Sequence, residues 1–220
     1  PVAVAALTMV FALAGRLIDK HSLVRQGRWN DRTSYMGQGL TTRTLGVIGA
    51  GSIGKEILNL ARPFFSRTLA TDPYADKVAV QHTGASLVDL NTLMGESDFV
   101  LVCCLLNEET YHLIDRQKLA LMKPTAYFLN LGRGPITDET ALIDALASKR
   151  IAGAGLDVTE QEPVAEDNPL LAMDNVIVTP HALCWTDECF HDIAATALES
   201  IVAYSLGEKP VHLVNPEVMA

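Results

Sequence analysis

The chain has 220 residues, which is enough for one large or two small domains, and 49% of them are apolar, which is ample for a packed core. Its formal net charge of −9 argues against nucleic acid as a main partner, because phosphate binding needs a basic surface. No apolar run reaches the roughly 20 uninterrupted residues of a membrane-spanning helix, so we expect no membrane partner.

The cysteines indicate a reduced protein rather than a disulfide framework. Cys103 and Cys104 are adjacent within an apolar run and are typical of reduced core residues. Cys184 and Cys189 lack the paired spacing of a zinc site. No signal peptide is evident, although the chain begins without an initiator Met. We therefore expect a cytoplasmic protein without a metal site.

The chain before the first predicted strand divides into an apolar and a polar part. Residues 1–20 predict one buried helix, with Pro1 suited to its first turn. Residues 21–44 are polar and contain Gly27 and Trp29, and we expect them to be irregular.

The next stretch contains a G-x-G-x-x-G pattern at Gly49, Gly51 and Gly54. Alone this pattern is weak, because three closely spaced glycines often arise by chance. Here the apolar run 45–48 before it predicts a strand, and residues 53–61 after it have helical spacing. This order is typical of a β-α-β unit that binds a dinucleotide, and the alternative is an ordinary glycine-rich turn in an α/β domain.

Each residue of this pattern has a physical task in the dinucleotide interpretation. Gly49 allows a tight turn, Gly51 lets the backbone approach a pyrophosphate, and Gly54 lets the helix pack close to the strand. The helix N-terminus offers free N–H groups to the phosphates. Asp72, at the end of the next apolar run, can accept hydrogen bonds from the ribose hydroxyls. Its charge would repel a 2′-phosphate, so the predicted cofactor is NAD rather than NADP.

Later in the chain, apolar runs alternate with stretches of helical spacing. The predicted strands are 99–104, 126–131, 152–158 and 176–179. The predicted helices are 116–122, 138–148 with Thr137 as N-cap, and 186–206 with Gly207 as its stop. Continuously apolar strands that alternate with helices indicate a parallel sheet covered on both faces. The sequence therefore predicts an α/β fold with a Rossmann-type, doubly wound parallel sheet in a single cofactor domain.

Polar side chains follow three of these strands. Arg133 comes after the strand 126–131, Asp157 lies at the end of the next strand with Glu162 beyond it, and His181 comes after the last. Ligands of parallel sheets bind at the carboxyl ends of the strands, so these side chains are expected to converge beside the cofactor. Together they suit hydride transfer to a 2-oxo acid, with His as the acid, a carboxylate that stabilises the imidazolium, and Arg as the ligand of the substrate carboxylate.

Each of these residues also has a plain alternative. Arg133 could pair with a surface acid, His181 could be a satisfied turn residue, and Glu162 could simply be solvated. The joint position after successive strands favours the catalytic interpretation.

Four motifs in this order resemble the D-isomer-specific 2-hydroxyacid dehydrogenases, and the resemblance spans nearly the whole chain. The motifs are Gly49-Ala-Gly-Ser-Ile-Gly54, Asn130-Leu-Gly-Arg-Gly134, Gly155-Leu-Asp-Val158 with Glu162-Pro163, and Thr179-Pro-His181. The resemblance implies that Arg133 binds the substrate carboxylate and carbonyl, that His181 is the acid/base, and that Glu162 is its partner.

The resemblance also implies an NAD site. Ser52, Ile53 and Asp72 would hold the pyrophosphate and ribose, and Asp157 would meet the nicotinamide amide. The whole implied cofactor set is Gly49, Gly51, Ser52, Ile53, Gly54, Asp72, Cys104, Leu105, Thr110, Leu131, Gly132, Arg133, Asp157 and His181.

The implied activity is NAD-dependent oxidoreduction of a small 2-hydroxy or 2-oxo acid of the glyoxylate, hydroxypyruvate or phosphoglycerate type. One alternative is an NAD(H)-sensing binding module, as in the transcriptional corepressors that the family resembles. Another is that these 220 residues are the whole protein. In that case NAD would bind to half an active site and turnover would be very poor.

The family has an N-terminal substrate domain that we expect to be largely missing from this sequence. We accordingly expect a dinucleotide-binding domain at 1–206 and a tail at 207–220 that would return to the absent domain. The resemblance implies a homodimer built on the first helix and the polar segment after it. Trp29 is a candidate contact there, and the alternative is a Trp packed on its own domain.

Overall fold

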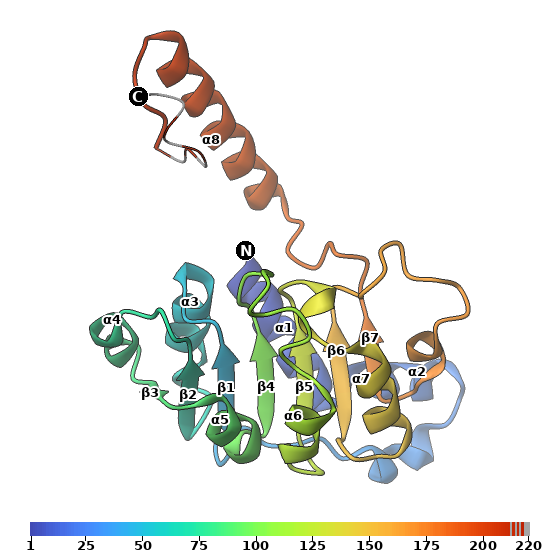
Figure 1. Ribbon diagram of the computed structural model, residues 1–220. Helices are drawn as coiled ribbons and strands as arrows, with labels where there is room; N and C mark the ends of the chain where they lie inside the picture. The colour runs from blue at the N-terminus through green and yellow to red at the C-terminus, as the bar shows by residue number, and fades with distance from the viewer. Residues whose placement is uncertain (212, 214, 216, 218–220) are drawn as a thin grey trace. The chain divides into compact units, whose positions relative to one another are not determined.

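The computed structural model describes residues 1–211, 213, 215 and 217, in two compact units (Figure 1). The sheet unit is residues 2–183, and the other unit is Pro1 with the chain from Cys184 onward. The expected boundary between 206 and 207 stays a prediction. Residues 212, 214, 216 and 218–220 of the expected tail lie outside the described residues.

A parallel sheet with the strand order β3-β2-β1-β4-β5-β6-β7 forms the centre of the sheet unit. The strands are β1 (Thr44–Ile48), β2 (Arg67–Thr71), β3 (Ser86–Leu87), β4 (Phe99–Val102), β5 (Tyr127–Asn130), β6 (Gly153–Leu156) and β7 (Val176–Val178). The strand order reverses between β1 and β4, which is the switch point at which open α/β sheets bind ligands. The predicted Rossmann-type α/β fold is confirmed.

Helices cover both faces of this sheet. They are α1 (Val2–Gly15), α2 (Leu17–Arg25), α3 (Ser52–Ala61), α4 (Lys77–His82), α5 (Leu90–Glu96), α6 (Arg116–Leu121) and α7 (Glu139–Ala147), with short 3-10 turns η1 (Trp29–Tyr35), η2 (Gly134–Ile136) and η3 (Pro169–Ala172). Successive strand residues point to opposite faces. Leu101 joins the core under α1 and α3, whereas Val100 and Val102 join the core under α5, α6 and α7.

The prediction of one helix over residues 1–20 is wrong. Arg16 adopts a left-handed conformation with φ 49°, and α1 and α2 meet there at a bend of 58°. The run of buried apolar residues ends with α1, and in α2 only Leu23 is buried. The chain after Gly15 therefore packs much less against the core. Within the described residues no single helix is long and apolar enough to cross a membrane, and α1 and α2 reach that length and composition only together, as a bent pair.

Several local details of the predictions also need correction. Residues 21–44 are not wholly irregular, because α2 continues to Arg25 and η1 follows. Thr137 is not the N-cap of α7. Asp138 takes that position and accepts from the Ala141 N–H at 3.0 Å, while the Thr137 hydroxyl faces inward to the Asn130 amide.

The last predicted helix is confirmed and lies in the other unit. Helix α8 (Asp187–Ser205) begins after Thr186, whose hydroxyl accepts from the Cys189 N–H at 3.1 Å. Gly207 follows the helix with φ 76°, a conformation that a glycine adopts without strain.

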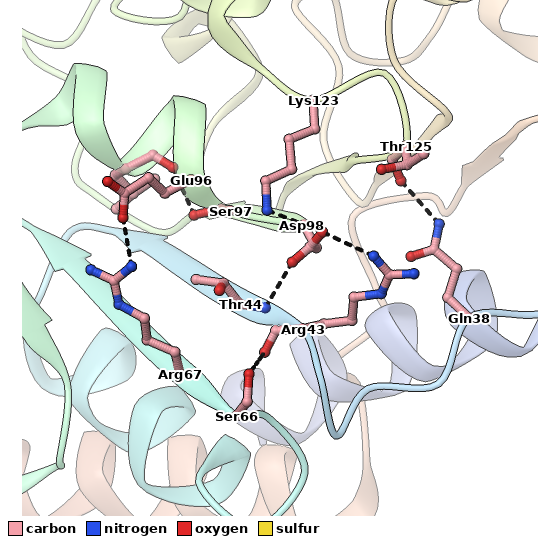
Figure 2. A network of polar contacts seen from close by, with 11 residues as sticks. Gln38, Arg43, Thr44, Ser66, Arg67, Glu96, Ser97, Asp98, Lys123 and Thr125 are labelled. Atoms are coloured by element: carbon pink, nitrogen blue, oxygen red, sulfur yellow. Dashed lines mark hydrogen bonds and ion pairs between the residues drawn. The ribbon is translucent and has the colours of Figure 1, made fainter.

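Asp98 joins three segments at the amino-terminal edge of the sheet (Figure 2). Its side chain is almost fully buried at the start of β4 and accepts from the Thr44 N–H at 2.9 Å. The other carboxylate oxygen pairs with Lys123 Nζ at 3.2 Å and Arg43 Nη1 at 3.4 Å. Asp98 thus ties β1 and the loop before β5 to β4.

We expect Asp98→Ala to lower the free energy of unfolding by about 2–4 kcal/mol. The change leaves the Thr44 N–H without its acceptor and removes the anion that faces two cations. Urea denaturation measures the effect. Glu96→Ala is the matched control, because it removes a carboxylate from an exposed ion pair with Arg67 and should cost less than about 1 kcal/mol. Equal losses in the two variants would contradict this role of Asp98.

Candidate active site

The glycine turn after β1 is packed tightly against the loop that follows β4. Gly49 has φ 96°, and a Cβ at this position would lie 2.6 Å from the Cys104 Cα. A Cβ at Gly54 would overlap the Gly49 carbonyl oxygen and lie 3.3 Å from the Cys103 Sγ. The first glycine therefore permits the turn and the third permits close packing of α3, as their spacing predicts.

Gly51 faces open space, and its position suits a ligand. Among the described residues, a Cβ there would meet nothing within 4 Å. Gly51 precedes α3 and provides no side-chain cap, so the first N–H groups of the helix are available to an anion. A cleft of about 500 Å³ opens at this point. Its lining includes Gly49, Gly51, Ser52, Ile53, Gly54, Asp72, Cys104, Leu105 and Thr110 from the implied cofactor set.

Asp72 stands at the end of β2 and holds the glycine turn in place. One carboxylate oxygen accepts from the Ala50 N–H at 2.8 Å, and the other accepts from the Tyr74 N–H at 2.8 Å. A carboxylate has further lone pairs, so Asp72 can still accept from a ribose hydroxyl at the wall of the cleft.

Two cleft residues, Tyr74 and Glu109, are absent from the sequence prediction. The Tyr74 hydroxyl donates to the Glu109 carboxylate at 2.7 Å, which joins the loop after β2 to the loop after β4. This hydrogen bond raises the pKa of Tyr74 above its usual value. The position of Tyr74 just after the strand-end Asp72 is the signal that could have identified it. For Glu109 the sequence offers only a polar loop.

The neighbouring thiols behave as core groups. The Cys103 thiol donates to the Gly49 carbonyl oxygen at 3.1 Å, and burial raises its pKa to about 12. Burial also raises the pKa of Cys104 to about 11. Both groups therefore stay protonated near neutral pH and are poor nucleophiles.

The structure brings Glu162 and His181 together. The strands β5, β6 and β7 are neighbours, so the loops after them share one edge of the sheet. His181 Nδ1 lies 2.8 Å from Glu162 Oε2, and Glu162 Oε1 accepts from the Thr159 N–H at 3.2 Å. Because Nδ1 faces Glu162, Nε2 is the ring nitrogen that can face a substrate. Both side chains line a cavity of about 620 Å³.

Arg133 lies at the same edge but has no polar contact with the Glu162–His181 pair. Its guanidinium donates to the Gly132 carbonyl oxygen at 2.7 Å, and it forms no ion pair with an acid in the described part of the chain. Asn130 shapes this loop, because its side-chain amide donates to the Arg133 carbonyl at 2.9 Å and accepts from the Gly132 N–H at 3.0 Å. The loop thus leaves the Arg133 side chain exposed for a ligand.

Asp157 holds the loop that carries His181. It accepts from the Thr179 hydroxyl at 2.6 Å and from the backbone N–H groups of Ala182 at 3.1 Å and Leu183 at 3.2 Å. Its implied contact with a nicotinamide amide stays a prediction. Leu131 and Gly132 follow β5 and lie outside the lining of the glycine cleft. Among the described residues, no group of three or more His, Cys, Asp or Glu side chains could hold a metal ion.

The chain is similar to known proteins over most of its length. Residues 7–182 match the model of the D-isomer specific 2-hydroxyacid dehydrogenase NAD binding domain. The chain is 39% identical over 217 residues to a glyoxylate reductase of Korarchaeum cryptofilum, covering 97% of this chain and 65% of that protein. It is 38% identical over 218 residues to glyoxylate/hydroxypyruvate reductase B of Pectobacterium carotovorum, covering 97% and 68%.

A solved structure shows the same fold. The apo D-lactate dehydrogenase of Escherichia coli has a TM-score of 0.84 at 32% identity, over 96% of this chain and 66% of that one. The chain thus spans about two thirds of the length of the proteins that it matches.

Proposed function

Because the chain belongs to the D-isomer specific 2-hydroxyacid dehydrogenases and carries their NAD binding domain, we propose that it transfers a hydride between NAD(H) and a small 2-oxo acid. The contact of 2.8 Å between His181 Nδ1 and Glu162 carries this proposal. Both side chains also line the cavity of about 620 Å³ at this edge of the sheet, where a small acid can reach them. The exposed guanidinium of Arg133, on the neighbouring strand-end loop, completes the set.

His181, Glu162 and Arg133 have different roles in the proposed reaction. NADH held in the cleft of the glycine turn and Asp72 would supply the hydride, with its two electrons, for the carbonyl carbon of the acid. His181 donates a proton from Nε2 to the carbonyl oxygen, so that the product is a 2-hydroxy acid. Glu162 stabilises the imidazolium before the proton leaves. Arg133 binds the substrate carboxylate through two parallel hydrogen bonds and polarises the carbonyl.

The names of the relatives favour glyoxylate or hydroxypyruvate as the acid. A phosphoglycerate-type substrate belongs to the same chemical class. The proposal is tested by measuring NADH oxidation by the full gene-encoded protein with a broad panel of 2-oxo acids. We expect turnover with at least one of them. NADH binding with no turnover across the panel would overturn the enzyme proposal and favour an NAD(H)-sensing module.

Asp72→Ala is expected to weaken NADH binding about tenfold and to reduce the preference for NADH over NADPH. The variant loses the acceptor of the Ala50 and Tyr74 N–H groups, and it loses the negative charge that opposes a 2′-phosphate. Fluorescence titration with both cofactors measures this preference. Asp76→Ala removes the same charge from the same loop outside the cleft lining and should leave it unchanged. An unaltered preference in Asp72→Ala would refute the predicted role.

The homodimer and the cytoplasmic location also stay proposals. Exposed apolar side chains on the first helices support the dimer. Val4 is 59% exposed on α1, and Phe11 is 38% exposed and packs edge to face on Phe64 of α3. Trp29 is 62% exposed, which favours a contact with a partner over packing on its own domain. Sedimentation velocity would measure the mass of the assembly.

A further inference from the structure

A second histidine–carboxylate pair includes Glu160, which precedes Glu162 by two positions in the sequence. His112 Nε2 lies 2.7 Å from Glu160 Oε1. Glu160 is in the loop after β6 that also carries Glu162, whereas His112 is in the loop after β4. Both side chains are about one third exposed, so water can reach them although each is held by the other. The proposed reaction gives this second pair no task.

Glu160 also forms hydrogen bonds with Glu139, the first residue of α7. Its own N–H donates to Glu139 Oε2 at 2.8 Å, and its Oε2 accepts from the Glu139 N–H at 3.2 Å. The Asn168 amide donates to Glu139 Oε1 at 2.8 Å, further along the same loop. Both carboxylates lie at the N-terminus of α7, where the helix dipole favours negative charge. The loop is thus fixed at both sides of Glu162.

The loop that carries Arg133 packs against the same point. A Cβ at Gly134 would overlap the carbonyl group of Thr159 and approach the Glu160 nitrogen. Thr159 in turn donates its N–H to Glu162 Oε1 at 3.2 Å. Only a glycine allows this approach, so the backbone at Thr159 and Glu160 sets the distance between the Arg133 loop and the Glu162 loop.

These contacts matter because the Glu162–His181 pair is not buried. The two side chains are 38% and 45% exposed, and a solvated pair of this kind contributes little on its own to holding its geometry. We propose that Glu160, held by His112 and Glu139, is a positioning residue that fixes the loop on which Glu162 meets His181. This inference rests on the proposed function, because that function makes His181 the proton donor.

Three variants of the whole protein test this inference. Glu160→Gln removes the charge that faces His112 and leaves a single acceptor oxygen for the His112 and Glu139 sides, so the loop should loosen. His112→Ala removes the contact outright. His112→Gln keeps a side-chain N–H that can donate to Glu160, so it should recover most of the loss. Glu96→Gln is the matched control, because it weakens the exposed Arg67–Glu96 pair away from the site.

The expected result is a fall in kcat of about tenfold in Glu160→Gln and His112→Ala, with the dissociation constant of NADH within about twofold of wild type. His112→Gln and Glu96→Gln should stay near wild type. The ring ¹⁵N shifts of His181 supply a readout that does not need turnover. Wild type should show the tautomer with the proton on Nδ1, facing Glu162, and the two damaging variants should show a mixture.

Folded Glu160→Gln and His112→Ala proteins with the wild-type tautomer and kcat within about twofold would overturn the inference. A wild-type protein that reduces no 2-oxo acid would instead overturn the proposed function. The tautomer of His181 would then decide the positioning role by itself: a mixture in the two variants supports it, and an unchanged tautomer refutes it.

Discussion

His181→Ala is expected to lower kcat for the reduction of a 2-oxo acid by about 10²–10⁴-fold while the dissociation constant of NADH changes little. The imidazole is the proposed donor of the proton, and its Nδ1 is engaged by Glu162 at 2.8 Å, so Nε2 faces the substrate. The glycine cleft that would hold the pyrophosphate and ribose has no contribution from His181. A selective loss of kcat is therefore the signature of the proposed role.

His82→Ala is the control for this experiment. His82 is an exposed histidine at the end of α4, on the β3 side of the sheet and away from both cavities. Its removal should leave kcat and NADH binding unchanged. Steady-state rates and NADH fluorescence titrations measure both quantities. If His181→Ala kept more than about a tenth of the wild-type kcat, His181 would not be the acid.

Gly54→Ala is expected to abolish measurable NADH binding and to lower the free energy of unfolding by about 1–3 kcal/mol or more. The added Cβ would take the place of the Gly49 carbonyl oxygen, so α3 would have to move away from β1. That movement displaces the helix N-terminus that faces the cleft.

Gly51→Ala separates cofactor binding from folding. Its Cβ would meet no atom of the described part of the chain within 4 Å, and its φ of −68° is accessible to alanine. The fold should therefore keep its stability, while the methyl group occupies space that a pyrophosphate needs. Urea denaturation and NADH titration of both variants measure the two effects. Equal stability losses in Gly51→Ala and Gly54→Ala would contradict this assignment of the glycines.

Local sequence patterns predict the cofactor half of the site because its geometry is local. The turn at Gly49 and the start of α3 depend on residues within one short segment. The rule that ligands bind at strand ends also links residues that are far apart in the sequence. It places Glu162 and His181 on neighbouring loops, and in the structure these two side chains meet across 19 positions.

Contacts between loops are the part that the sequence does not reveal. His112 and Glu160 are 48 positions apart, and Tyr74 and Glu109 are 35 apart, so no periodicity links them. The break at Arg16 is not predicted from the sequence for another reason. The apolar pattern of α1 stops at Gly15, but helical propensity continues into α2, so composition alone suggests one helix.

The most direct test of the proposed hydride transfer is a single-turnover measurement on the full gene-encoded protein. NADH is bound first, the complex is mixed with glyoxylate or hydroxypyruvate, and the decay of bound-NADH fluorescence is followed in wild type and in His181→Ala. If His181 is the proton donor, the signal is lost rapidly in wild type, with one 2-hydroxy acid formed per NADH consumed, and decays far more slowly in the variant. Equal decay rates in the two proteins, or NADH that persists in wild type with every 2-oxo acid tried, would contradict it.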